Sequence, residues 1–244
     1  MSFDLRDASS PNHDQRPDGM PIDTLVLHYT GMTSPAEALA RLRDPEAKVS
    51  SHYMVDMDGI VWRLVPEARR AWHAGASFWR GRSGLNDRSI GIEIANPGHS
   101  HGYPDFPVLQ MAVVCDLSLD ILSRHAIAAR DIVGHADISP DRKDDPGEKF
   151  DWRGLAQAGV GLWPGGTPDL GIVGIEREAR VLRDVRAALA VIGYRVAPEG
   201  ALDPALSQVL RAFQRHWRPE TVNGQADAGT IARLVAVARL FSAG

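Results

Sequence analysis

Two histidines that each end a short apolar run are the strongest chemical signal in this sequence. His28 follows Thr24-Leu-Val-Leu, and His135 follows Asp131-Ile-Val-Gly. In sheets covered by helices, sites gather where strands end and the chain turns out of the core. This placing predicts that the two imidazoles serve one site.

The segment that begins at His135 is rich in charge. It reads His135-Ala-Asp-Ile-Ser-Pro-Asp-Arg-Lys-Asp-Asp-Pro-Gly147 and carries one lysine and four aspartates. Two neutral imidazoles and one carboxylate form a common catalytic zinc set that leaves a fourth position for water. His28, His135 and one loop aspartate therefore predict a zinc site, although spacing does not choose among the aspartates. The alternative is an ordinary histidine in each strand and a solvated acidic turn.

Glu93 lies within the apolar run Ile90-Gly-Ile-Glu-Ile94. A buried carboxylate is costly unless it is paired or lies beside a metal ion, so Glu93 is a candidate general base. The alternative is an edge-strand glutamate that points to solvent. Lys143 is a candidate for stabilising a developing oxyanion with its positive charge; the alternative is a solvated loop lysine.

Strands and helices alternate through the first two thirds of the chain. The sequence pattern predicts strands over residues 24–28, 89–94 and 131–134. It also predicts a hairpin at Asp58-Gly59, which lies between two β-rich runs. Helices are predicted from Ser34, where Ser-Pro-Ala-Glu forms a capping signal, and over 108–129. These elements predict an α/β fold with a mixed central sheet flanked by helices.

The chain divides into a larger and a smaller unit. Residues 1–160 form the predicted catalytic domain, 161–172 a linker rich in glycine and proline, and 173–244 a small bundle of three helices. The net charge changes from negative before the linker to positive after it. We expect the bundle to be independent, since its helices carry enough apolar positions to bury one another. The alternative is that Ile192, Leu206 or Phe213 pack on the catalytic domain.

Composition excludes several classes of protein. The 244 residues are 44% hydrophobic and 24% charged, which is ordinary for a globular protein and excludes disorder. No apolar run approaches the ~20 residues of a membrane span. A net charge of −4 gives no reason to expect nucleic-acid binding. Met1–Ser10 lacks the basic and apolar regions of a secretory signal, and Cys115 is the only cysteine, so a cytoplasmic location is predicted.

Five motifs, in this order, resemble one known family. They are Leu25-Val-Leu-His28-Tyr-Thr, Ser50-Ser-His-Tyr53, Ala71-Trp-His73-Ala-Gly75, Ile90-Gly-Ile-Glu93 and the segment from Gly134 to Gly147. Together they look like the type 2 zinc N-acetylmuramoyl-L-alanine amidases, in the AmpD- and AmiD-like branch. The family shares its fold with phage T7 lysozyme and the peptidoglycan recognition proteins. The resemblance covers about residues 18–163.

The resemblance implies a site and a substrate. It implies one Zn²⁺ bound by His28, His135 and Asp145, with Glu93 as catalytic acid and base. It further implies Lys143 as the group that stabilises the tetrahedral intermediate, and Tyr53 and His73 as residues that line the site. The implied reaction is hydrolysis of the amide bond between the lactyl group of N-acetylmuramic acid and L-alanine, in peptidoglycan or muropeptide fragments.

The tail resembles the three-helix peptidoglycan-binding module over about residues 176–240. Such a module favours a periplasmic or cell-envelope location, which is the alternative to the cytoplasm. Two other functions compete with the amidase. One is a non-catalytic peptidoglycan-binding protein on the same fold, and the other is a glycosidase that uses Glu93 and an aspartate as paired carboxylates.

Overall fold

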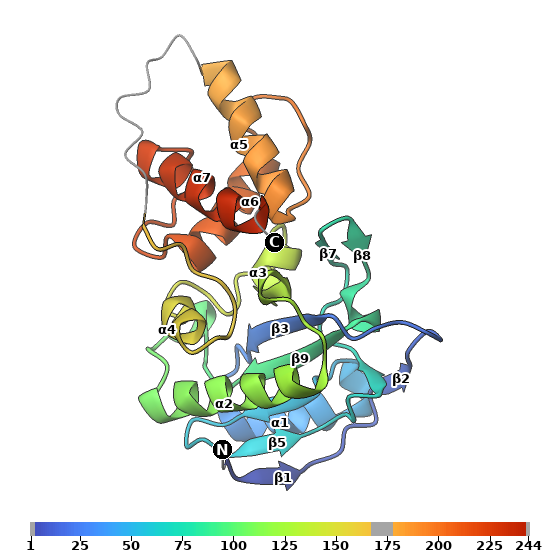
Figure 1. The fold of residues 1–244 in the computed structure, drawn as a ribbon. Coiled ribbons are helices and arrows are strands. Elements are labelled where there is room, and N and C mark those ends of the chain that lie inside the picture. Colours follow the sequence, from blue (N-terminus) through green and yellow to red (C-terminus); the bar gives the residue numbers. More distant parts are fainter. Residues whose placement is uncertain (1–2, 167–177, 243–244) are drawn as a thin grey trace.

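A mixed sheet of six strands forms the centre of the larger unit (Figure 1). The computed structural model describes residues 3–166 and 178–242. Strands β4 and β5 pair antiparallel, and the other neighbours in the sheet are parallel. In spatial order the strands are β1 (Leu5–Asp7), β5 (Val61–Arg63), β4 (Tyr53–Val55), β9 (Ser89–Ile94), β3 (Thr24–Tyr29) and β10 (Ile132–Gly134). This confirms the predicted mixed sheet and the predicted hairpin.

Two small ribbons and several helices complete the fold. The ribbons pair β2 (His13–Gln15) with β6 (Arg69–Ala71) and β7 (Phe78–Trp79) with β8 (Arg82–Ser83). The α-helices are α1 (Pro35–Arg43), α2 (Val108–Arg124), α3 (His135–Ile138), α4 (Trp152–Gln157), α5 (Glu178–Ile192), α6 (Pro204–Trp217) and α7 (Ala228–Ser242). Short 3-10 turns are η1 (Pro45–Ala47), η2 (Leu85–Asp87), η3 (His99–His101) and η4 (Ala129–Asp131).

The helix starts follow the predicted capping signals. The Ser34 hydroxyl accepts the Glu37 N–H at the start of α1. Asp203 accepts the Leu206 N–H at the start of α6. The helix predicted over 108–129 is shorter, because it ends at Arg124 and the chain then turns through η4 into β10.

Alternation along β3 and β9 separates a core face from a site face. Leu25, Leu27 and Ile92 belong to the apolar cluster that α2 covers. His28 and Glu93 come one residue later and therefore point to the opposite face. The strands thus deliver both side chains to the side of the sheet away from α2.

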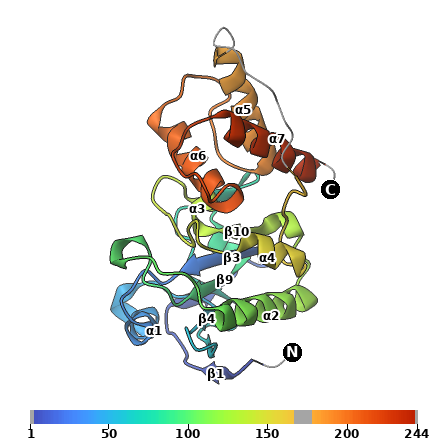
Figure 2. The same cartoon turned by 90° about the vertical axis from the view of Figure 1, so that its left-hand side faces the viewer.

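The site face is covered in two parts. Ala38 and Leu42 of α1 pack with Met54 over one side of the sheet. On the same face, nearer the β10 edge, Val26 and Val133 belong to a cluster that includes α3 and the C-terminal helices. Figure 2 shows those helices beyond α3 and the β10 edge, with α1 further along the sheet. The strip of sheet between α1 and α3 is where His28 and Glu93 lie.

The three C-terminal helices share one core with the catalytic domain. Trp79, Leu85 and Ile138 belong to the same buried cluster as Leu189 and Phe213. The rings of Trp79 and Tyr194 meet edge to face with centroids 5.2 Å apart. The structure therefore favours the alternative, that the bundle packs on the larger unit, over the expectation of an independent bundle. The sequence shows apolar stripes but not which surface each stripe covers.

The described part of the predicted linker also has packing partners. Leu162 and Trp163 pack against the shared cluster, and Trp163 stacks on Trp217 with ring centroids 6.0 Å apart. The rest of that segment, residues 167–172, lies outside the described residues. Within residues 3–166 and 178–242, no helix is both long and apolar enough to cross a membrane.

Deleting residues 173–244 should destabilise the remaining chain. It would expose Trp79, Leu85 and Ile138, each worth about 1.5–3 kcal/mol of burial. Since about 1 kcal/mol shifts the melting midpoint by about 2–4 °C in a protein of this size, we expect a fall of roughly 10 °C or more. Thermal melts of the two proteins measure it, with Val191→Ala at an exposed position as control. An unchanged midpoint would show that the shared core contributes no stability.

Candidate active site and metal centre

Three parallel strands bring the candidate site residues to one edge of the sheet. His28 on β3 lies opposite Glu93 on β9 in the strand register. His135 is the first residue of α3, directly after β10, which is paired with β3 on its other side. Because parallel strands end at the same edge, the three side chains meet above it, as the strand-end pattern predicted.

His28, His135 and Asp145 form a compact cluster. The His28 Nδ1 atom lies 3.0 Å from His135 Nδ1 and 3.1 Å from Asp145 Oδ2, and the latter two atoms are 3.2 Å apart. The three residues are only 1%, 3% and 6% exposed. The Ala136 N–H donates to the Asp145 carbonyl oxygen at 2.8 Å, which holds the loop against α3. Of the four loop aspartates, Asp145 is the one that the fold places beside both histidines.

The proton on His135 can be assigned from its partners. Its Nε2 atom lies 3.2 Å from the carbonyl oxygen of Ala74, and 3.4 Å from Arg142 Nη2, whose shorter hydrogen bonds go to the carbonyl oxygens of Ala74 and Ala76. A carbonyl oxygen only accepts hydrogen bonds, so Nε2 carries the proton. In the neutral ring, Nδ1 then presents a lone pair to His28 and Asp145.

A longer chain of hydrogen bonds assigns the proton on His28. The Ser89 hydroxyl donates to the Leu85 carbonyl oxygen at 2.6 Å, so it accepts from His73 Nε2, 3.1 Å away. The other nitrogen of His73, Nδ1, is then an acceptor and lies 3.0 Å from His28 Nε2. His28 Nε2 therefore donates, and its Nδ1 atom presents a lone pair to the cluster.

In these tautomers three atoms with lone pairs face one another, an arrangement that a cation between them would stabilise. Burial and the neighbouring His135 lower the pKa of His28 to about 4, so it is neutral at pH 7. Atoms 2.0–2.1 Å from a tetrahedral metal ion lie roughly 3.3 Å apart, close to the separations here. The three residues could therefore hold a metal ion.

Glu93 lies beside this cluster with an unused oxygen. Its buried Oε2 atom has no hydrogen-bond partner in the described parts of the chain. Burial, reinforced by Asp145, raises the pKa of Glu93 well above its usual range, while Lys143 acts in the opposite direction. A buried carboxyl group with a raised pKa is a candidate for general acid–base catalysis.

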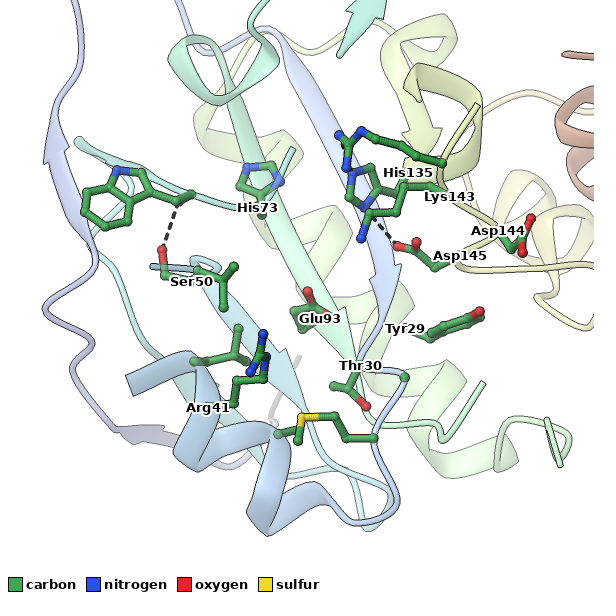
Figure 3. Close-up of a pocket in the computed structure, with 17 residues that line it drawn as sticks. Tyr29, Thr30, Arg41, Ser50, His73, Glu93, His135, Lys143, Asp144 and Asp145 are labelled. Carbon is green, nitrogen blue, oxygen red and sulfur yellow. Dashed lines mark hydrogen bonds and ion pairs between the residues drawn. The ribbon is translucent and has the colours of Figure 1, made fainter. Parts of the chain in front are cut away.

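A cavity of about 390 Å³ opens over these groups (Figure 3). Its floor carries Glu93 and His135, and Lys143 and Asp145 border it from the loop after α3. Arg41 of α1 forms part of the opposite wall. Lys143 makes no ion pair within residues 3–166 and 178–242, so its ammonium group is available to a ligand.

Tyr53 lies elsewhere, which corrects the expectation that it lines the site. Its side chain belongs to the cluster on the α2 side of the sheet, and its hydroxyl donates to Glu67 at 2.8 Å. Tyr53 lies opposite Ile92 in the register, and Ile92 also faces α2. The sequence motif Ser-Ser-His-Tyr does not reveal which face of β4 each residue takes. His73 does border the cavity, and it also bonds His28.

Two further residues support the site without a direct signal from their type. A Cβ atom at Gly91 would lie 2.5 Å from Cγ of His73, so only glycine leaves room for that ring. Arg142 donates to the carbonyl oxygens of Ala74 and Ala76, at 2.6 and 2.8 Å, and holds that segment beside His135. Sequence analysis missed Arg142, because an acceptor on the main chain leaves no trace in the residue types.

Two histidines and an aspartate that could hold a metal ion, beside a carboxyl group with a raised pKa, are typical of the active site of a hydrolase. Residues 18–148 match the family model described as N-acetylmuramoyl-L-alanine amidase, and residues 181–234 match that of a peptidoglycan binding domain. The chain is 40% identical to the N-acetylmuramoyl-L-alanine amidase AmiD of Escherichia coli over 224 residues, which cover 86% of this chain and 79% of that protein.

Solved structures agree over nearly the whole chain. AmiD from E. coli, in complex with anhydro-N-acetylmuramic acid-L-Ala-D-gamma-Glu-L-Lys, matches with a TM-score of 0.77 and 38% identity, covering 93% of this chain and 92% of that one. AmpDh3 from Pseudomonas aeruginosa, in complex with anhydromuramic pentapeptide, matches with a TM-score of 0.80 and 33% identity, covering 92% and 94%. The chain therefore belongs to the N-acetylmuramoyl-L-alanine amidase family, whose enzymes hydrolyse the bond between N-acetylmuramic acid and L-alanine.

Two neighbouring aspartates should differ sharply when each is replaced by alanine. Asp145→Ala removes a carboxylate from the buried cluster and should abolish both stoichiometric metal binding and activity. Asp144→Ala should change both little, because the Asp144 side chain is 52% exposed and pairs with Arg215 at the surface. Elemental analysis and hydrolysis assays of both proteins decide. The reverse ranking would mean that the other aspartate is the ligand.

The assigned protons give a second test. His73→Phe removes the acceptor of the His28 Nε2 proton, so His28 can take the other tautomer, and metal affinity should fall by about 10–100-fold. His73→Asn places an amide oxygen near the position of Nδ1 and should retain most of the affinity. Competition with a chromogenic chelator measures it. Equal affinities for the Phe and Asn variants would rule out the orienting role of His73.

Proposed function

We propose that this amidase hydrolyses its substrate with one Zn²⁺ per chain, held by His28, His135 and Asp145. The observation that carries the proposal is the convergence of two imidazole lone pairs and one carboxylate oxygen at 3.0–3.2 Å. Two imidazoles, one carboxylate and an open fourth position are a usual catalytic zinc set. The 390 Å³ cavity provides the open side.

Zinc at this position supplies Lewis-acid chemistry, which polarises a carbonyl group and makes water nucleophilic near neutral pH. Glu93 accepts a proton from the attacking water and passes it to the leaving amine of L-alanine. Its raised pKa suits both steps, since the same group must first accept and then donate. Its unpaired Oε2 atom is free to bind that water.

Lys143 lines the same cavity as Glu93, from the loop after α3 (Figure 3). As the carbonyl carbon becomes tetrahedral, its oxygen gains negative charge. A cation already in place stabilises that charge without reorganisation at the moment of reaction. The absence of an ion pair for Lys143 in the described ranges supports this role.

The proposed substrate is a peptidoglycan fragment that carries muramic acid joined to a stem peptide. The relatives AmiD and AmpDh3 were solved with anhydromuramic peptides, and this chain matches both over more than nine tenths of its length. The match of residues 181–234 to a peptidoglycan binding domain supports a second contact with the polymer. A cytoplasmic location, with the cell envelope as the alternative, stays a prediction.

The Glu93→Gln variant tests the mechanism and the reaction together. Glutamine keeps the size of the side chain but cannot take the proton, so zinc should bind as in the wild type while turnover falls roughly 10²–10⁴-fold. Mass spectrometry of products from anhydro-muropeptides and from intact sacculi measures the turnover and shows which substrate is preferred. Near-normal turnover would make Glu93 structural.

A control with chelator completes that test. Activity of the wild type should disappear with chelator and return with Zn²⁺, and the product should be a free stem peptide. Release of a cut glycan that does not depend on metal would instead indicate a glycosidase. Active protein without stoichiometric metal would overturn the zinc proposal.

A further inference from the structure

Asp137 is a buried carboxylate shared between the two units of the chain. It lies on α3, two residues after His135, and is 2% exposed. Its Oδ2 atom accepts the Gly134 N–H at 2.8 Å and the His216 Nδ1–H at 2.7 Å. Its Oδ1 atom accepts the hydroxyl proton of Tyr194. We call Asp137, Tyr194 and His216 the interdomain node.

Both side-chain donors in the node come from the C-terminal unit. Tyr194 follows α5 and His216 lies on α6, and they are 3% and 5% exposed. The His216 ring is stacked on Trp152 of α4, with centroids 3.8 Å apart and planes 15° apart. Its other stacking partner is Trp217 at 4.0 Å. The orientation of the imidazole is thus set by packing, and Nδ1 is directed at Asp137.

The catalytic domain alone leaves Asp137 short of partners. Within the described residues, its only donor from that domain is the Gly134 N–H. Loss of a hydrogen-bond donor to a buried carboxylate strongly destabilises the folded state, because neither water nor the protein then compensates the negative charge. The C-terminal unit therefore completes the environment that keeps Asp137, and with it α3, in place.

The node is adjacent to a residue of the metal cluster. Helix α3 has only four residues and begins with His135. Asp137 binds back to the Gly134 N–H, so the turn from 134 to 137 is closed around His135. A second contact, between Arg215 and Asp144, is solvent-exposed on the Asp144 side and contributes little. The buried node is the main polar connection from α6 to the ligand-bearing segment.

We propose that the C-terminal unit is a positioning element of the metal centre, and that His216 and Tyr194 hold α3 so that His135 points at its partners. This role is separate from binding of peptidoglycan. It rests on the proposed metal site, and it adds that metal affinity depends on residues more than 50 positions away in the sequence. The unit thus has a function even when the substrate is a small soluble fragment.

The test compares three variants of the full chain. His216→Phe keeps an aromatic ring between the tryptophans but removes the donor, and Zn²⁺ affinity should fall by about 10–100-fold, as for other residues that orient ligands. His216→Asn restores an N–H near the position of Nδ1 and should recover most of the affinity. Leu234→Ala is the control, because it opens a cavity at a buried position of α7 and removes no hydrogen-bond donor or acceptor of the node. It should lower the melting temperature and leave Zn²⁺ affinity unchanged.

A spectroscopic readout separates geometry from stability. The visible spectrum of the Co²⁺-substituted protein reports ligand geometry, so it should change in His216→Phe and remain that of the wild type in His216→Asn and Leu234→Ala. If His216→Phe does not fold, Tyr194→Phe removes a single hydroxyl and should show the same changes to a smaller extent.

Two outcomes have distinct meanings. Wild-type Zn²⁺ affinity and a wild-type Co²⁺ spectrum in folded His216→Phe, or in Tyr194→Phe if that variant alone folds, would overturn the positioning role. Failure of the wild-type protein to bind Zn²⁺ would instead overturn the proposed metal site, and the inference with it. If Leu234→Ala lost as much Zn²⁺ affinity as His216→Phe, the node would act only through the overall stability of the fold, and the positioning role would be overturned.

Discussion

The structure depends on an electrostatic constraint: three atoms with lone pairs are held within 3.2 Å of one another in a buried site. Left without a cation, such an arrangement is repulsive, so the rest of the fold must hold it together. The sheet supplies His28, the turn after β10 supplies His135, and the contact between the Ala136 N–H and the Asp145 carbonyl secures the third residue. These contacts hold the three side chains in place before any metal ion binds, so the geometry of the site is preorganised.

The same constraint explains the surroundings of the two histidines. An imidazole offers a lone pair from Nδ1 only if its proton is held at Nε2. Ala74 provides the acceptor for His135, and the chain through His73 to Ser89 provides it for His28. The glycine at position 91 follows from this chain, because its lack of a side chain makes room for His73. Gly91, His73 and Ser89 thus share one physical role, which is to keep the proton of His28 on Nε2.

Sequence reasoning predicted the parts of the site that lie where strands end. His28 and His135 each follow a short apolar run, and the parallel strands bring both to the same edge of the sheet. That His28 and Glu93 lie opposite each other came only from the strand register. Sequence reasoning did not choose among the loop aspartates, since the path of an irregular loop depends on contacts made elsewhere in the fold. The family resemblance indicated Asp145, and the structure places that residue at the cluster. Tyr53 shows the opposite case, because its motif suggested the site while its register turns it toward α2.

The relation between the two units was the hardest feature to predict, for the same kind of reason. Each C-terminal helix carries an apolar stripe, and a stripe fits a neighbouring helix as well as it fits another domain. The deciding groups are polar: His216 and Tyr194 were unremarkable in the sequence, and their partner Asp137 was one acidic residue among four in a loop. A buried carboxylate requires donors at defined positions, whereas apolar packing tolerates many arrangements. The interdomain node therefore favours one arrangement of the C-terminal helices on α3, and burial of apolar side chains around Trp79 and Phe213 adds stability to that arrangement.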